Sequence, residues 1–239
     1  MRNSLLVCLV GLFLLGLAPS SFADLNGSQL EMSSAVGGGA LESGPVRDWG
    51  EDWIFYDDNA NDENADRVFY FVNFRIWNRV TFTPNSDFTL EGMRVMTWNP
   101  NGDDEYPCQI RVYSETGNNH GIDEILYEYE TNDVPNDWWD HEMEEEDYLE
   151  FAGPADGQPA ESFSIAVGPA PGRGPNQDED LWYVVTDASA SGHTYVAFSD
   201  DNGDPADRWF GIGDGIDSDC RIRANGSYAD DFYDLAITG

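Results

Sequence analysis

Apolar and polar residues alternate from Val68 to Trp98, on both sides of a polar break at Pro84 to Asp87. Val80 and the neighbouring Arg79 show the pattern: in an extended chain, consecutive side chains point to opposite faces. A period of two therefore predicts strands with one buried face. We interpret the two halves as a β-hairpin, with a slip in register at Gly92.

Further short strand-like runs lie on both sides of this stretch, separated by Gly, Pro, Asn and Asp. These runs lie at residues 53–56, 109–113, 125–130, 162–167, 181–186, 194–199, 220–224 and 232–237. Strand-like runs at this spacing favour an all-β fold, a two-sheet antiparallel β-sandwich of jelly-roll-like type, in a single domain over residues 48–239. Residues 137–150 have two interpretations, a helix or a long acidic connection.

The N-terminus has the pattern of a secretory signal peptide at residues 1–23. Arg2 precedes an apolar run from Leu5 to Leu17, and small residues end the segment at Ala23. Residues 24–47 are rich in Gly and Ser and predict a flexible leader. We therefore expect a secreted, extracellular protein, cleaved after Ala23 and without membrane insertion.

The charge is strongly negative, because 46 acidic residues face 11 basic ones and the net charge is −35. All the basic residues are arginines. Such a chain repels nucleic acid and anionic lipid, so neither is expected as a partner. Its own carboxylates also repel one another, and either high ambient salt or bound Ca²⁺ could screen them.

Five segments resemble, in their order, the landmarks of a jelly-roll-like accessory module of large secreted bacterial cell-surface proteins. They are FRIWNRVTFTPNSDFTLEGMRVM, CQIRVYS, LWYVVTD, HTYVAFSDDNG and CRIRANG, and the resemblance covers Asp48 to Tyr228. It implies an extracellular, non-catalytic role. Residues 1–239 show no pattern of the protease domain or sorting tail that we expect beside such a module, and in this they depart from that setting.

Cys108 and Cys220 begin the similar segments CQIRVY and CRIRA. An even pair of cysteines in an exported protein predicts a disulfide between them. A metal site is the competing interpretation, but no histidine or further cysteine lies nearby in the sequence.

Three loops, at residues 57–66, 200–207 and 214–219, are rich in oxygen ligands. Asp200, Asn202 and Asp204 follow the alternation that can direct carboxylates toward calcium, and Asp207 completes the predicted set of ligands. We expect calcium as a structural ion there, and solvated turns in an acidic protein are the alternative.

Eight tryptophans suggest a surface for stacking sugars. Trp138, Trp139 and Trp209 stand in polar surroundings and are the predicted carbohydrate-binding residues, with a polysaccharide or cell-surface glycan as the expected partner. Packing of these rings beneath long loops is the alternative.

We expect a non-catalytic module for extracellular binding or adhesion. One alternative is a jelly-roll glycoside hydrolase that uses Glu142 and Glu146, since carboxylates alternate there as they do on one strand face of such enzymes. The other is a structural surface protein that self-assembles through sheet edges. The sequence does not set the oligomeric state.

Overall fold

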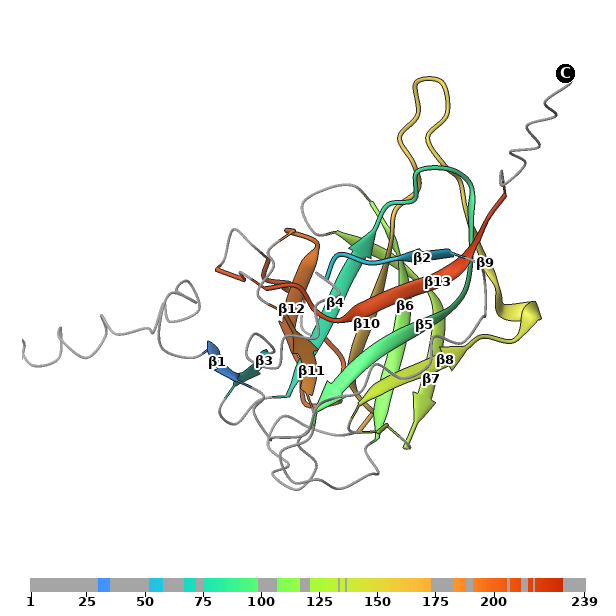
Figure 1. Ribbon diagram of the computed structural model, residues 1–239. Coiled ribbons are helices and arrows are strands. Elements are labelled where there is room, and N and C mark those ends of the chain that lie inside the picture. Colours follow the sequence, from blue (N-terminus) through green and yellow to red (C-terminus); the bar gives the residue numbers. More distant parts are fainter. Residues whose placement is uncertain are drawn as a thin grey trace, which may run out of the picture.

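The computed structural model describes residues 30–34, 52–57, 67–71, 75–98, 107–116, 121–132, 134–135, 137–172, 183–187, 191–205, 207–211, 215–216 and 218–229. These residues form an all-β sandwich of two antiparallel sheets (Figure 1). The predicted fold class is confirmed. The predicted signal peptide and the run at 232–237 lie outside the described residues.

The strands divide unequally between the two sheets. The five-stranded sheet has the order β12 (Thr194–Phe198), β4 (Ile76–Phe82), β10 (Phe163–Pro169), β6 (Cys108–Glu115) and β7 (Ile122–Thr131). The eight-stranded sheet has the order β1 (Leu30–Ser34), β3 (Arg67–Phe71), β11 (Tyr183–Thr186), β5 (Phe88–Trp98), β13 (Ile222–Tyr228) and β2 (Asp52–Ile54), with β8 (Trp138–Glu142) and β9 (Leu149–Phe151) also paired to β5. β1 lies within residues 24–47, the predicted leader, and pairs with β3 of the domain.

The segment at 137–150 is mostly extended. It contains β8, a single 3₁₀ turn η1 (Glu145–Asp147) and the start of β9, so the helix left open by the sequence does not form. Within the described residues, no helix has the length and apolar character needed to cross a membrane.

The predicted hairpin is wrong, because β4 and β5 belong to opposite sheets. The turn at residues 83–87 carries the chain from one sheet to the other, and both strands direct their apolar residues into the same core. The register slip is confirmed: Asn225 pairs with Gly92 but Gly226 pairs with Leu90, which leaves an extra residue in β5.

The core lies between the sheets and is rich in phenylalanine. Phe163 on β10 stacks on Phe151 of β9 at 4.2 Å between ring centroids and on Phe82 of β4 at 5.3 Å. All three rings are buried. Burial of one such side chain contributes about 1.5–3 kcal/mol, so this contact between sheets is a large part of what holds the layers together.

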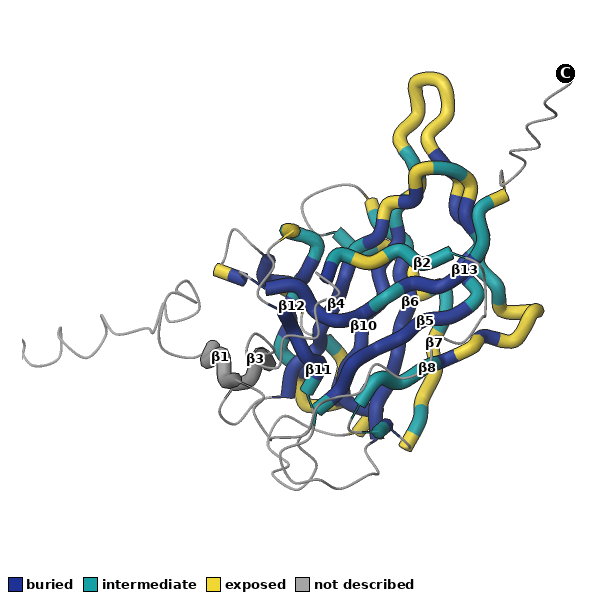
Figure 2. Tube along the Cα trace, viewed as in Figure 1, coloured by how far each residue is buried: buried dark blue, intermediate teal, exposed yellow. Residues whose placement is uncertain are grey.

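The outer face of the five-stranded sheet is also covered, as the buried central strands in Figure 2 show. Arg79 is 0% exposed, and its guanidinium lies 4.6 Å from the ring centroids of both Tyr195 and Trp209. Arg111 lies 4.9 Å from Trp77. The polar residues that alternation assigned to a solvated face are therefore stacked between aromatic rings.

The eight-stranded sheet repeats this arrangement. Arg94 lies over Trp53 at 5.2 Å and pairs with Asp140, while Arg223 lies over Trp138 at 4.5 Å. Each such cation–π contact contributes about 0.5–2 kcal/mol, depending on its exposure.

The predicted disulfide is absent, because Cys108 and Cys220 are both free thiols. Cys108 begins β6 in the five-stranded sheet, opposite Thr131 and Pro169. Cys220 is bridged to Thr186, at the end of β11 in the other sheet, and its Sγ contacts Asn78 Oδ1 at 3.7 Å. Burial raises the pKa of both thiols, which keeps them protonated.

His141 joins the two sheets at one side of the sandwich. It lies on β8, while Tyr127 and Tyr129 lie on β7. The Tyr127 hydroxyl is 2.8 Å from His141 Nε2, and the Tyr129 ring stacks on the imidazole at 4.0 Å. Burial lowers the pKa of His141 to about 4, so the ring is neutral at pH 7.

This burial predicts an acid-sensitive contribution to stability. The unfolded chain binds a proton at His141 near pH 6.5 and the folded chain near pH 4, so stability is full above pH 6.5 and falls as the pH drops through this window. At about 1.4 kcal/mol for each pKa unit, the loss is roughly 3 kcal/mol. Urea unfolding at several pH values should show a smaller loss for His141→Gln. Equal pH dependence in both proteins would contradict this contribution.

A second prediction concerns the close contact between β4 and β10. A Cβ atom at Gly168 would overlap the indole ring of Trp77, whose Nε1 donates to the Gly203 carbonyl at 2.8 Å. Gly168→Ala should therefore lower the free energy of unfolding by about 1–3 kcal/mol. In a Trp77→Leu background the same substitution should cost less, and equal costs in the two backgrounds would argue against the overlap.

Candidate functional site

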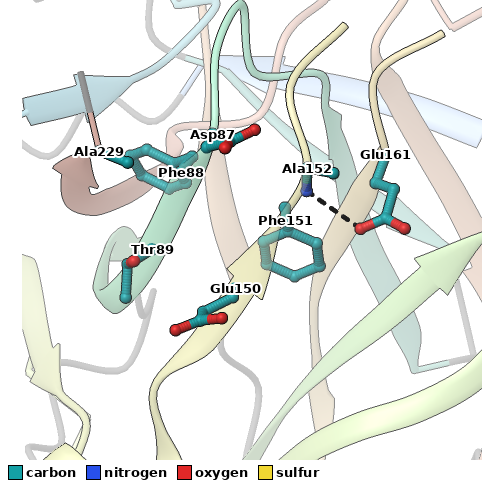
Figure 3. Close-up of a pocket in the computed structure, with 8 residues that line it drawn as sticks. All are labelled: Asp87, Phe88, Thr89, Glu150, Phe151, Ala152, Glu161 and Ala229. Atoms are coloured by element: carbon teal, nitrogen blue, oxygen red, sulfur yellow. Dashed lines mark hydrogen bonds between the residues drawn. The ribbon is translucent and has the colours of Figure 1, made fainter. Parts of the chain in front are cut away.

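Two adjoining pockets lie beside β9 and share Glu150, Phe151, Ala152 and Glu161. The wide pocket has a volume of about 900 Å³, and the narrow pocket about 370 Å³. Figure 3 shows the narrow pocket, in which residues from the start of β5, the β9 segment and the segment before β10 come together. Its remaining lining residues are Asp87, Phe88, Thr89 and Ala229.

Side-chain-to-backbone hydrogen bonds hold the shared wall of the pockets in place. Glu161 Oε2 accepts the Ala152 N–H at 3.0 Å, and Asp87 Oδ1 accepts the Gly153 N–H at 2.8 Å. A Cβ at Gly153 would overlap the backbone of Ser86, so glycine permits this close approach. The exposed hairpin at residues 154–159 is thus attached to the turn before β5.

The lining of the wide pocket is mixed. Leu126, Phe151 and Pro159 supply apolar surface, and Phe151 is fixed from behind by its stacking on Phe163. Carboxylates and hydroxyls complete the wall; they come from Ser114, Glu115, Thr116, Glu150, Glu161 and Ser162. Apolar surface beside a few polar groups is the usual composition of a small-molecule site.

Glu115 connects the wide pocket to the outer layer of arginines. Its side chain is only 7% exposed, it lies 3.7 Å from Arg79 Nη1, and it accepts hydrogen bonds from Thr81 at 3.1 Å and from Ser164. Burial raises the pKa of Glu115, and the charge of Arg79 opposes that rise. The carboxylate is therefore held in one orientation by three partners.

The structure does not bring the three predicted sugar-binding tryptophans together. Trp209 is 6% exposed and covers Arg79, so its ring is packed inside the structure and does not lie on the surface. Trp138 is half-buried above Arg223, and Trp139 packs against the core. None lines either pocket. A guanidinium group lies over the Trp138 ring and another lies over the Trp209 ring.

The predicted calcium ligands form hydrogen bonds within their own loop. Asp200 Oδ1 accepts the backbone N–H groups of Asn202 and Asp204 at 2.8 and 2.9 Å, and Asp204 pairs with Arg111 at 2.6 Å. Asp207 is exposed. Over the part of the chain that the structure describes, no three or more His, Cys, Asp or Glu residues are grouped to hold a metal ion. Calcium at this loop stays a prediction.

Glu142 and Glu146 do not share one strand face. Glu142 ends β8, whereas Glu146 lies in the 3₁₀ turn η1, and both are exposed. Neither residue lines a pocket. The alternation of carboxylates stops because the strand ends at Glu142.

Sequence reasoning missed Asp87, Glu115, Glu150 and Glu161. Glu150 and Glu161 flank a segment with the Gly and Pro residues of a tight turn, GPADGQP, and that signal could have placed them side by side. No local sequence pattern connects Asp87 or Glu115 to Glu150 and Glu161. Asp87 directly precedes β5 and Glu115 ends β6, so both are distant from the β9 segment in the sequence.

Comparison with known proteins found no protein family whose model matches the chain, no similar curated protein and no similar solved structure. The function of this chain is therefore inferred from its own residues.

Proposed function

We propose that this protein is an exported, non-catalytic binding module that acts outside the cell and takes a carbohydrate in the two pockets beside β9. The observation that carries the proposal is the lining of the wide pocket, where Leu126, Phe151 and Pro159 lie among carboxylates and hydroxyls. A sugar offers the complementary surface, with C–H groups on its ring faces and hydroxyl donors around the rim.

The size of the wide pocket supports this class of ligand. Small-molecule sites have volumes of about 300–1,000 Å³, and the wide pocket, at about 900 Å³, accommodates a short oligosaccharide. The narrow pocket continues from it across the shared residues Glu150 and Glu161. An extended glycan chain could therefore contact both.

The charges of the pockets narrow the choice of ligand. Asp87, Glu150 and Glu161 are exposed carboxylates that accept hydrogen bonds from hydroxyl groups and repel anions. With a net charge of −35 on the whole chain, acidic glycans are disfavoured further. A neutral polysaccharide is the ligand that fits.

Glycan binding tests this proposal directly. The protein should be retained on a subset of neutral glycans in an array, and the double variant Glu150→Gln with Glu161→Gln should bind them about tenfold more weakly or worse, since a hydrogen bond to a charged group contributes about 1.5–3 kcal/mol. The glutamine at 161 keeps an oxygen that can accept the Ala152 N–H, so folding should be preserved.

The matched control removes the same charge elsewhere: Glu144→Gln with Glu145→Gln changes two exposed residues that line neither pocket. This control should bind as the original chain does. Failure of the original chain to bind any neutral glycan, or equal binding by both double variants, would overturn the proposal.

A further inference from the structure

The two edges of the five-stranded sheet differ in how they are covered. At one edge, Val196 of β12 exchanges backbone hydrogen bonds with Phe210 at 2.8 and 2.9 Å, and Ser199 is bridged to Pro205. At the other edge, β7 pairs with β6 alone among the described strands. β7 is a strand of ten residues whose pairing with β6 shifts register twice, and its outer edge offers backbone N–H and C=O groups.

Two large apolar side chains of β7 are exposed along this edge. Ile125 is 46% exposed and Tyr129 is 38% exposed, and both are among the few large apolar side chains that the described surface exposes. Asp123, Glu124 and Glu130 are exposed beside them. The edge thus combines apolar anchors with negative charge.

Very little positive charge faces solvent to balance these carboxylates. Among arginines with described side chains, five are buried: Arg75, Arg79, Arg94, Arg111 and Arg221. Arg111 pairs with Glu128 of β7 at 2.7 Å, so that carboxylate is already neutralised, whereas the other three acidic residues of β7 extend the negative surface.

Charge complementarity selects the occupant of the edge. A second copy of the chain would bring its own acidic β7 to the same place, and like charges on adjacent strands are destabilising. An extended segment with Arg or Lys at alternate positions would place opposite charges across the new strand pair, and its remaining side chains could contact Ile125 and Tyr129.

We propose that β7 is a docking edge, at which an extended basic segment of another protein adds as a sixth strand to the five-stranded sheet. Main-chain hydrogen bonds supply affinity, and Asp123, Glu124 and Glu130 select basic side chains. The competing role for these carboxylates is to prevent any strand from pairing at the edge.

A capped peptide of alternating Arg and Val residues is the probe, with fluorescence anisotropy as the measurement. The full chain should bind it, and a version of the peptide with Pro in place of Val should bind at least about tenfold more weakly, because proline cannot donate to a strand ladder. Equal binding of the two peptides would show charge attraction alone and would overturn the proposal.

Variants of the protein locate the binding. Asp123→Asn, Glu124→Gln and Glu130→Gln together should weaken binding of the Arg-Val peptide about tenfold. The matched control, Asp156→Asn, Asp201→Asn and Asp207→Asn, removes three exposed carboxylates that lie outside β7 and should change binding less than about twofold. Equal losses in the two triple variants would contradict docking at β7.

Sedimentation of the protein alone tests whether a second copy of the chain, in place of a basic segment, occupies the β7 edge. The chain should not dimerise through this edge at low salt, because its acidic strands repel. A concentration-dependent dimer that Ile125→Lys abolishes would assign the edge to a second copy and overturn the proposal.

Discussion

The stacking of arginine between aromatic rings is the interaction on which this sandwich depends. Burial of a guanidinium ion is costly unless its charge is compensated. Here Arg79 has two rings and Glu115, and Arg223 has the Trp138 ring and the carboxylate of Asp57. On the outer faces of both sheets, aromatic rings and a carboxylate compensate the buried charge of the arginine. The central strands can therefore be buried on two sides although every second residue is polar.

The binding site that we propose lies away from this outer layer. Arginine lies over the rings of Trp138 and Trp209, so these aromatic side chains contribute to the stability of the outer layer. The hollow surfaces lie instead at the end of the sandwich, where the β9 segment and its hairpin leave the sheet. Carboxylates gather there because the arginines are already paired within the layers.

Alternation in the sequence predicted the two-layer fold, most of the strands and the inward direction of Val80 and Phe82. It could not predict which strands pair, because a period of two identifies a face and not a neighbour. For that reason β4 and β5 look like a hairpin, although they lie in opposite sheets. Cys108 and Cys220 have similar local sequences for the same reason and still lie in different sheets. The pocket residues were missed because they meet only through this sheet pairing.

The distribution of charge also limits the partners of the protein. With its described arginines largely buried or paired, the chain presents a surface that repels anions at the pockets and at β7 alike. A neutral ligand can enter a pocket whose carboxylates accept its hydroxyl groups, while a basic segment gains most along an edge where backbone groups and carboxylates are both accessible. One packing arrangement, arginine inside and carboxylates outside, is thus the basis of both partners that we propose, at two separate surfaces.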